Sequence, residues 1–418
     1  MKHIGVLESN LSGSGFEGLR VAKELGHRVT FFTRDLERYL AVPGAARYFE
    51  DYVDEIVSCE TNELGSVMHK VRQMDPFHPF SGFLTLGDYD VVVAAGVASE
   101  LGLPTPDPAA VTTARNKALM RQRCAVAGVP MPRFAQVTTY EQAVAAAREI
   151  GTPCVVKPAD ETSGSDVRRC GSVDEVTAHF LTIATKSSNA RGQRRGYPKV
   201  LVEECVHGFE VSVEVLAMGG GRFHVFGVTD KTIGGHNHFV ELGHLFPSQL
   251  DERIVARCED VAVAALRAVG FDLGMAHVEV RYNLTSGPSL IEINPRPPGG
   301  KITDLIDHSL DVRCLELVVR QYLGEHIRDE LPARASRGAA VRYLTADPGT
   351  VVSVSGIEAA AGIRGVTEAV VYSRVGEQVR SLRRNHDRIG HVLAVAGNAY
   401  LAGRLAEAGA HEIAVITR

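Results

Sequence analysis

The sequence has no CxxC pair, no long hydrophobic run and no excess of basic residues. Its seven cysteines are scattered and odd in number, which argues against a disulfide framework or a zinc cage and fits a reducing cytosol. No run approaches the roughly 18 apolar residues of a membrane span, and the apolar N-terminal stretch is too short for a signal sequence. A net charge of −5 argues against broad binding to nucleic acid or anionic membranes. These absences predict a soluble, cytoplasmic protein.

What is present is the composition of an ordinary multidomain globular chain. Hydrophobic residues make up 45% and charged residues 23% of the 418 positions, and at roughly 100–200 residues per domain this length predicts two to four domains. The proline-rich stretch 103–108 cannot continue a helix and predicts a domain boundary near Asp107. We expect an N-terminal domain at 1–106, a central domain at 107–332 and a small C-terminal α+β domain at 333–418.

Hydrophobic periodicity predicts an α/β protein. Strands and helices alternate at the start of the chain, which indicates a parallel sheet covered by helices. Three successive glycines, 219–221, predict a hairpin turn. The expected strands are 4–7, 29–33, 88–95, 154–157, 200–203, 211–217, 223–229, 277–281, 289–293 and 413–417. The expected helices are 18–25, 109–127, 253–269 and one around 400–408.

Acidic and polar residues end two neighbouring predicted strands. Glu279 closes the first. In the second, Glu292, Asn294 and Arg296 are two residues apart, so their side chains project from one face. Oxygen ligands of this kind suit Mg²⁺ held jointly with nucleotide phosphates, and the guanidinium can bridge phosphoryl oxygens. The alternative is a solvent-facing polar stripe, but an open Pro-Pro-Gly-Gly backbone follows at 297–300, which a ligand can approach closely.

Two other segments suggest nucleotide contacts. Lys157 ends an apolar strand, where burying an ammonium is costly unless an anion meets it, and a phosphate is a natural partner. The small residues at 162–165 can fold over phosphates through backbone N–H groups. Residues 200–213 run from a strand through two acids to Glu210, a pattern that fits an adenine-binding hinge with a ribose-binding acid. The alternative for Lys157 is a lysine whose charged end reaches the solvent from the end of its strand, and the alternative for 200–213 is an ordinary hairpin.

In order and spacing these motifs resemble the ATP-grasp superfamily over about 107–300, with a related frame on either side. The resemblance implies a Rossmann-like N-terminal domain, an ATP-grasp domain with a mobile lid at about 130–208, and ATP with Mg²⁺, or Mn²⁺ in its place. To ATP it assigns the phosphate lysines Lys117 and Lys157, the flap residues Ser163, Gly164 and Ser165, the adenine-hinge residues Glu203, Glu204 and Val206, and the ribose acid Glu210. It assigns Glu279, Glu292 and Asn294 as metal ligands, and it assigns Arg296 as the residue that steadies the acyl phosphate. Asp166, directly after the flap, departs from the small residue of many relatives.

The segment 229–248 resembles the L-amino-acid ligase branch, in which a glutamate and a histidine three residues on line the amino-acid pocket. Here these are Glu241 and His244, and Gly299 and Gly300 suggest a roomy or backbone-lined pocket. The segment 387–394 resembles the closing domain of carboxylate–amine ligases and carboxylases, which the shorter D-alanine ligase type lacks.

The resemblance implies an ADP-forming ligase. A substrate carboxylate would attack the γ-phosphorus of ATP, and an amine would then displace phosphate from the acyl phosphate. The implied catalytic residues are Arg296, Lys157 and His244. The expected partners are small-molecule carboxylates and amines, with amino acids foremost, and homodimers are common in the superfamily.

Three alternatives remain. A GxGxxG string at 13–18 with Asp35 beyond the second strand is typical of NAD-binding folds, but residues 9–12 separate the first strand from the first glycine, where a tight turn is needed. The ATP-grasp fold can also serve a carboxylase or a purine-pathway ligase that uses bicarbonate or a nucleotide amine. A regulatory nucleotide-binding module would not need both metal acids together with the asparagine and arginine beside them.

Two polar segments receive no role. The basic stretch 186–199 lacks apolar periodicity, and we predict a surface loop rather than a phosphate clamp. His236 and His238 are two residues apart, as metal ligands can be, but no third soft ligand is near in the sequence. A polar loop is the prediction for this pair.

Overall fold

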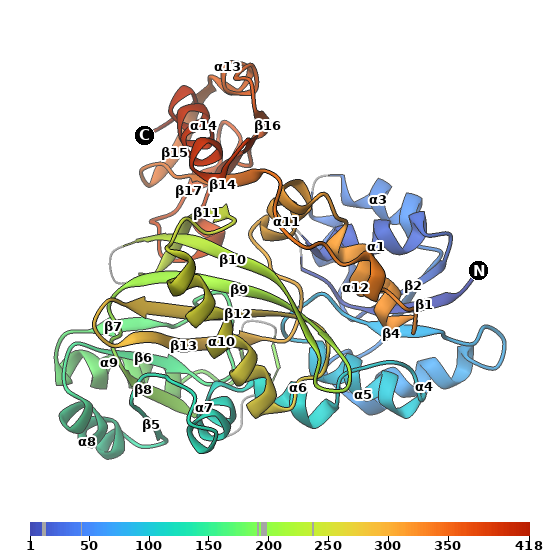
Figure 1. The fold of residues 1–418 in the computed structure, drawn as a ribbon, viewed down its shortest axis with the longest axis horizontal. Coiled ribbons are helices and arrows are strands. Elements are labelled where there is room, and N and C mark those ends of the chain that lie inside the picture. Colours follow the sequence, from blue (N-terminus) through green and yellow to red (C-terminus); the bar gives the residue numbers. More distant parts are fainter. Residues whose placement is uncertain (11–13, 43, 190–191, 194–198, 236–237) are drawn as a thin grey trace.

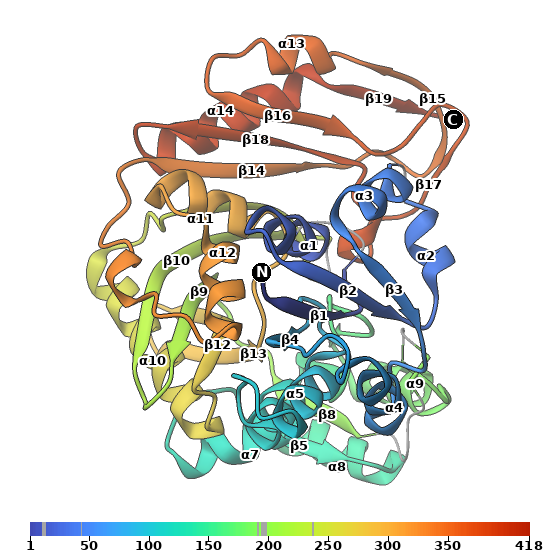
Figure 2. The ribbon, with the colours of Figure 1, turned by 90° about the vertical axis from the view of Figure 1, so that its right-hand side faces the viewer.

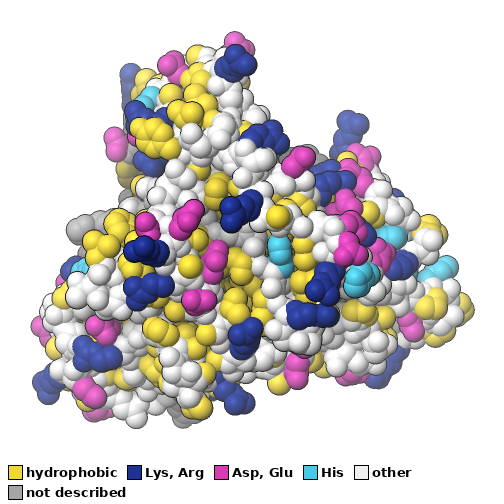
Figure 3. Space-filling model, viewed as in Figure 1, with side chains coloured by type: hydrophobic (Ala, Val, Ile, Leu, Met, Phe, Trp, Pro, Cys, Tyr) yellow, Lys and Arg dark blue, Asp and Glu magenta, His cyan; other side chains and the backbone are white. Residues whose placement is uncertain are grey.

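The computed structural model describes residues 1–418 except 11–13, 43, 190–191, 194–198 and 236–237. Its N-terminal, central and C-terminal regions adjoin a long central sheet, as Figure 1 and Figure 2 show. On the face drawn in Figure 3, acidic and basic side chains are interspersed rather than gathered into one basic surface. Within the described ranges, no helix has the length and apolar character needed to cross a membrane.

A parallel four-stranded sheet opens the chain. Its order is β3-β2-β1-β4, with β1 at His3–Leu7, β2 at Arg28–Thr33, β3 at Glu55–Ser58 and β4 at Gly82–Leu84. Ile4 and Phe31 pack on one face while Leu7 and Phe32 pack on the other, so both faces are covered, as is usual for parallel sheets. The helices are α1 (Ser14–Glu24), α2 (Leu36–Leu40), α3 (Ala45–Tyr52), α4 (Leu64–Met74) and α5 (Val91–Glu100). The predicted first two strands and first helix are confirmed.

The prediction of a strand at 88–95 is wrong. Residues 88–90 form a turn, and α5 begins at Val91. This helix is buried over most of its surface and packs against α4 and α6. A short run that is apolar all round carries no periodicity with which to tell a helix from a strand. The fourth strand of the sheet is β4 instead.

A second, antiparallel sheet forms the region predicted to be a lid. Its order is β5-β8-β6-β7, with β5 at Phe134–Val137, β8 at Val200–Glu204, β6 at Cys154–Pro158 and β7 at Arg168–Cys170. The helices α8 (Tyr140–Ile150) and α9 (Val173–Ala184) pack on it through one apolar cluster. The predicted strands at 154–157 and 200–203 are confirmed.

The largest sheet has eight strands in the order β13-β12-β9-β10-β11-β14-β18-β16. Their bounds are β9 Phe209–Met218, β10 Phe223–Gly234, β11 Val240–Phe246, β12 Leu273–Asn283, β13 Gly287–Asn294, β14 Gly338–Leu344, β16 Val366–Val371 and β18 Gly390–Ala396. The predicted hairpin between β9 and β10 is confirmed, and its three glycines all have φ between 64° and 74°. The central strands alternate: Val211, Val213 and Val278 face the helix α10 (Glu252–Val269), whereas Glu210 and Glu279 face the opposite side. This polar face carries the candidate site.

The helix predicted at 109–127 is two helices, α6 (Pro108–Arg115) and α7 (Lys117–Val126). Asn116 interrupts them with an extended backbone, and its side chain accepts hydrogen bonds from the N–H groups of Ala118 and Leu119. The break makes Lys117 the first residue of α7 and directs it toward the end of β13.

The chain closes with an α+β region. After α11 (Ile302–Leu310) and α12 (Cys314–Tyr322), a small antiparallel sheet forms from β17 (Gln378–Val379), β15 (Gly349–Ser355) and β19 (Ala414–Thr417). The short helix α13 is Ile357–Ala361, and α14 (Ala399–Glu412) packs on β14 and β18. Because β14, β18 and β16 extend the eight-stranded sheet, that sheet crosses the predicted boundary at 333. The domain limits themselves stay predictions.

Candidate active site

The predicted metal residues lie on the polar face of the eight-stranded sheet. β12 and β13 are antiparallel, and their register puts Glu279 directly opposite Glu292 and His277 opposite Asn294. The two carboxylates are partly exposed, whereas Asn294 is buried. Among the described residues, no three His, Cys, Asp or Glu side chains form a metal-binding group. The arrangement is therefore two carboxylates and an amide, a set that needs further oxygen ligands to complete a Mg²⁺ shell.

Both predicted phosphate lysines are buried and ion-paired. Lys117 Nζ lies 2.8 Å from Glu292 and donates to the Glu161 carbonyl at 2.6 Å. Lys157 Nζ lies 2.7 Å from Glu203. Burial lowers the pKa of Lys157, and the Glu203 carboxylate only partly offsets this. The lysines thus reach the site from α7 and from the lid.

Glu203, predicted at the adenine hinge, has its side chain committed elsewhere. Its carboxylate accepts from Arg121 Nε at 2.8 Å and Nη2 at 3.1 Å as well as pairing with Lys157. Burial would raise the pKa of Glu203, but these two cations hold it at about 2. Only backbone groups of Glu203 are left for a nucleotide. Arg121 was not predicted as a site residue; it is fully buried one turn after Lys117 and also donates to two carbonyls of β13.

One arginine contacts both Val206 of the predicted hinge and the predicted ribose acid Glu210. Arg281 donates to the Val206 carbonyl at 3.0 Å and pairs with Glu210 at 2.7 Å. Glu204 instead points outward and pairs with Arg133 at 3.2 Å. The structure therefore brings Val206 and Glu210 together and leaves the Glu204 side chain at the surface.

A buried lysine that the sequence analysis gave no role connects the predicted subsites. Lys231 Nζ lies 2.7 Å from Glu241, 2.9 Å from Glu279 and 3.4 Å from Glu210. Burial alone would lower the pKa of Lys231, but the three carboxylates raise it well above its ordinary value. In return, the pKa values of Glu241 and Glu279 are held low despite burial. The available signal was a lysine two residues after Thr229 on a buried strand, where an ammonium needs an anion.

The predicted amino-acid pocket forms at the edge of this cluster. Glu241 lies 3.6 Å from His244 Nε2, which has no closer hydrogen-bond partner among the described residues. Burial lowers the pKa of His244 more than Glu241 raises it. Gly300 has φ +61°, and a Cβ added there would lie 2.8 Å from His244 Nε2, whereas one added at Gly299 would meet open space.

Two residues of the C-terminal region also hold Glu241, and the sequence analysis did not single them out. Asn385 Nδ2 donates to its carboxylate at 2.9 Å, and Arg388 Nη1 donates to its carbonyl at 3.2 Å. Arg388 lies within the segment 387–394 that carried the C-terminal resemblance, so a signal was available for it.

Arg296, predicted to steady the acyl phosphate, forms an ion pair with Asp88 and donates to the Pro297 carbonyl at 2.8 Å. Burial would raise the pKa of Asp88, but Arg296 outweighs it, and the net shift is downward. Asp88 belongs to the segment that was wrongly predicted as a strand, which is why its role was missed.

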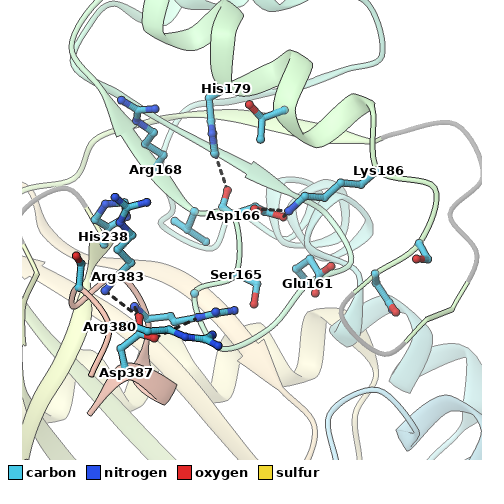
Figure 4. A pocket seen from close by; sticks show the side chains of 17 residues that line it. Glu161, Ser165, Asp166, Arg168, His179, Lys186, His238, Arg380, Arg383 and Asp387 are labelled. Atoms are coloured by element: carbon cyan, nitrogen blue, oxygen red, sulfur yellow. Dashed lines mark hydrogen bonds and ion pairs between the residues drawn. The ribbon is translucent and has the colours of Figure 1, made fainter. Parts of the chain in front are cut away.

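The predicted flap is a turn between β6 and β7. Ser163, Gly164 and Asp166 all have φ between 54° and 70°, and Ser163 and Gly164 are exposed. The Asp166 carboxylate pairs with Lys186 at 2.6 Å, so the acid that departs from the family pattern is neutralised. Ser165 and Asp166 line a cavity of about 660 Å³ that is drawn in Figure 4.

Several predictions fall partly outside the described residues. In the GxGxxG string Gly13 lies outside them, whereas Gly15 and Gly18 belong to α1. The basic segment 186–199 is described only at 186–189, 192–193 and 199, and His236 is not described. His238 lines the cavity of Figure 4.

Three known families match parts of this chain. Residues 150–304 match the ATP-grasp domain, residues 19–105 the ATP-grasp N-terminal domain, and residues 342–418 the L-amino acid ligase C-terminal domain 2. The uncharacterized protein y4rH of Sinorhizobium fredii (strain NBRC 101917 / NGR234) is 31% identical over 82% of this chain and 69% of its own length. The alanine–anticapsin ligase of Bacillus amyloliquefaciens is 26% identical over 59% of this chain and 57% of its own length.

The fold has solved counterparts. The crystal structure of an L-amino acid ligase from Bacillus licheniformis superposes with a TM-score of 0.83 at 21% identity, covering 100% of this chain and 99% of that one. The ATP-grasp fold and the resemblance predicted from the sequence are thereby confirmed. The chain belongs to the ATP-grasp ligase family, with a C-terminal domain of the L-amino acid ligase type.

Proposed function

We propose that the protein activates the carboxylate of an amino acid as an acyl phosphate, at the expense of ATP, and joins it to an amine. One arrangement carries this proposal: Glu210, Glu279 and Glu241 all lie within 3.4 Å of the same Lys231 ammonium. The first two belong to the predicted ribose and metal positions, and the third belongs to the predicted amino-acid pocket. Nucleotide and amino acid would therefore meet on one face of one sheet, as phosphoryl transfer between them requires.

The donor set fits the metal that such a reaction uses. Glu279, Glu292 and Asn294 offer only hard oxygen ligands, and nucleotide phosphates would complete the shell of Mg²⁺, or of Mn²⁺ in its place. When bound, the ion would neutralise charge on the transferred phosphoryl group. Lys117 and Lys157 would add positive charge on the phosphate side, and the flap at 163–165 would cover the phosphates.

The remaining residues would direct two bond exchanges. A carboxylate oxygen of the substrate attacks the γ-phosphorus and the bond to ADP breaks; the amine nitrogen then attacks the acyl carbon and phosphate leaves. Arg296 would hold the anionic acyl phosphate, and Glu241 would receive the α-ammonium of the amino acid. His244, whose lowered pKa keeps it neutral near pH 7, would accept the proton that the attacking amine loses.

The comparisons support amino acids as substrates, because the named relatives are an L-amino acid ligase and an alanine–anticapsin ligase. The chain spans only 57% of the latter, so its activity here is a proposal. We place the protein in the cytoplasm because all seven cysteines are free thiols. A homodimer stays a prediction, which sedimentation would test.

Phosphate release would test the function. The protein is incubated with ATP, Mg²⁺ and each amino acid, alone and in pairs, and products are identified by mass spectrometry. We expect phosphate only when an amino acid is present, together with a condensed product. If no amino acid causes phosphate release but bicarbonate or a nucleotide amine does, the carboxylase or purine-type alternative would replace the proposal.

Two variants locate the amino-acid pocket. Glu241→Ala and His244→Ala should raise the KM for the amino acid or abolish condensation while ATP still binds. Glu358→Ala, at an exposed position on α13, is the control. Loss of ATP binding in both pocket variants would instead assign this region to the nucleotide.

A further inference from the structure

The cavity of about 660 Å³ lies between the lid and the C-terminal region. One wall is the flap turn at 164–168 with α9, and another is the segment 380–387 that follows β17. Figure 4 shows Arg168 and Lys186 on the lid side and Arg380 and Arg383 on the opposite side, with Ser165 and Asp166 between them. Side chains far apart in the sequence thus border one space.

Positive charge dominates the lining. Among the residues that the structure describes, five cationic side chains border the cavity, namely Arg168, Lys186, Arg380, Arg383 and Arg384. The acidic side chains of the described lining are three, Glu161, Asp166 and Asp387, so this part of the lining has an excess of two positive charges.

Three of these five cations have no acidic partner among the described residues. Lys186 pairs with Asp166 at 2.6 Å, and Arg384 lies 3.6 Å from Asp387. Within the part of the chain that the structure describes, the guanidinium groups of Arg168, Arg380 and Arg383 form no ion pair and no hydrogen bond. Like charges around a shared cavity repel one another, and an anion bound between them offsets that repulsion. The guanidinium fork matches carboxylate and phosphate oxygens.

The cavity adjoins the proposed reaction site on both walls. On the lid side, Glu161 borders the cavity, and its carbonyl accepts from Lys117 at 2.6 Å. On the opposite side, the segment 380–387 and the residue after it hold Glu241: Asn385 donates to its carboxylate at 2.9 Å, and Arg388 donates to its carbonyl at 3.2 Å. A molecule in the cavity would therefore lie beside both the flap and the amino-acid pocket.

We propose that this cavity binds the anionic part of the amine substrate, and that this amine carries two negative charges. The inference rests on the proposed ligase function and narrows its acceptor. The group that the cavity would bind is a dianion, held by Arg168, Arg380 and Arg383. Its source is either the pair of carboxylates of an acidic amino acid or the phosphate of a phosphorylated amine, and the experiment distinguishes the two.

The first step separates the function from the cavity. With ATP and Mg²⁺, the donor amino acid is identified by trapping its acyl phosphate with hydroxylamine, a nucleophile without any anionic group. Hydroxamate formation establishes the ligase reaction independently of the cavity, and its absence would count against the proposed function alone. The cavity is then tested by calorimetric titration with L-alanine, L-aspartate and O-phospho-L-serine, in the presence of ADP.

The second step compares acceptors that differ in charge: L-alanine, L-aspartate and O-phospho-L-serine. We expect kcat/KM for one of the last two to exceed that for alanine by about tenfold or more, the effect of at least one charge-assisted contact. A preference for aspartate identifies a dicarboxylate, and a preference for phosphoserine identifies a phosphate ester. Equal use of all three, or equal binding in the calorimeter, overturns the proposal.

Variants connect the preference to the cavity. Arg380 and Arg383 are exposed, so the double variant Arg380→Ala/Arg383→Ala should fold. We expect the ratio of kcat/KM for the dianion to that for alanine to fall about tenfold or more. Arg374→Ala removes an exposed arginine of the same region outside the cavity and should leave the ratio unchanged. A preference that persists in the double variant would contradict the assignment.

Discussion

The side-chain nitrogen of Lys231 lies 2.9 Å from a carboxylate oxygen of Glu279, on a neighbouring part of the same sheet and 48 residues away in sequence. Glu241 and Glu210 approach the same nitrogen from two other strands. One ammonium thus balances three largely buried carboxylates. A network of this kind is costly to break, because removing one member leaves uncompensated charge behind.

Lys231→Met should therefore destabilise the protein by about 3–5 kcal/mol at pH 7, as measured by urea unfolding. Without the ammonium, burial would raise the folded pKa values of Glu241 and Glu279 above their unfolded values. The penalty should then be full at neutral pH and shrink as the pH falls toward about 4.5, because the carboxyls of the folded variant bind protons over this range while those of the unfolded chain are still mostly ionised. Lys23→Met, which breaks the surface pair with Asp54, should cost no more than about 1 kcal/mol. Equal losses in the two variants would contradict the importance of the network.

Glu279→Gln and Glu292→Gln keep the side-chain shape and remove the charge that would hold Mg²⁺. We expect each to lower ATP turnover on the order of 10²–10³-fold and to raise the Mg²⁺ concentration needed for half-maximal rate. Glu358→Gln, exposed on α13, is the charge-matched control. Full ATP turnover in both variants would show that the metal residues are wrongly assigned.

Strand periodicity explains why some of this site was predictable. Glu292 and Asn294 are two apart on one strand, so their common face follows from the sequence, and the structure has them on the face that also carries Glu279. Lys231 was not predictable as a partner, because its meeting with Glu279 depends on the order of β10, β9 and β12. Local patterning contains no information on strand order across distant segments.

The wrong strand at 88–95 has a similar cause. Asp88 was placed in a strand because a short apolar run follows it, and only packing against α4 and α6 makes that run a helix. Glu203 stays a prediction at the adenine hinge, but the pairing of its side chain with Arg121 from α7 could not be predicted, because the two elements are far apart in the chain. Tertiary partners decide the role of such residues, and one sequence does not reveal them.

Asp88→Asn removes the charge that holds Arg296. Breaking a buried ion pair costs about 3–5 kcal/mol. We expect a smaller loss of stability here, because the amide oxygen of the variant can still accept a hydrogen bond from Arg296. We also expect a lower kcat for phosphate release, since Arg296 would no longer be oriented. Asp347→Asn, an exposed site, is the control. A variant that loses stability and keeps its kcat would make the pair purely structural.

Gly300→Ala should disturb the amino-acid pocket, and Gly299→Ala offers a neighbouring control. At Gly300 the new methyl would lie 2.8 Å from His244 Nε2 and 3.2 Å from the Tyr343 hydroxyl, on a backbone with φ +61°. The left-handed conformation alone costs roughly 1–2 kcal/mol for a residue with a Cβ. We expect lower stability and a higher amino-acid KM for Gly300→Ala, and unchanged stability for Gly299→Ala, which meets open space. Equal stability of the two variants would rule out this steric role for Gly300.

Asp307 gives the fold a dependence on pH that a single substitution should remove. Burial raises its pKa to about 7, and Asp304 adds to the rise, whereas the Cys314 N–H bond at 2.8 Å and Arg313 oppose it. Because this folded pKa lies above the ordinary 3.8, the group favours folding most below pH 3.8, and that contribution is lost as the pH rises through 7. The loss is no more than about 4 kcal/mol.

Asp307→Asn keeps an oxygen for the Cys314 N–H group and carries no charge at any pH. We expect the variant to unfold at a higher urea concentration than the parent at pH 8 and at a similar one at pH 4. Asp329→Asn, at an exposed position that also precedes the predicted C-terminal domain, should show no such difference. A constant gap between Asp307→Asn and the parent from pH 4 to pH 8 would mean that Asp307 does not ionise in this range, because only a titrating group makes the gap change with pH.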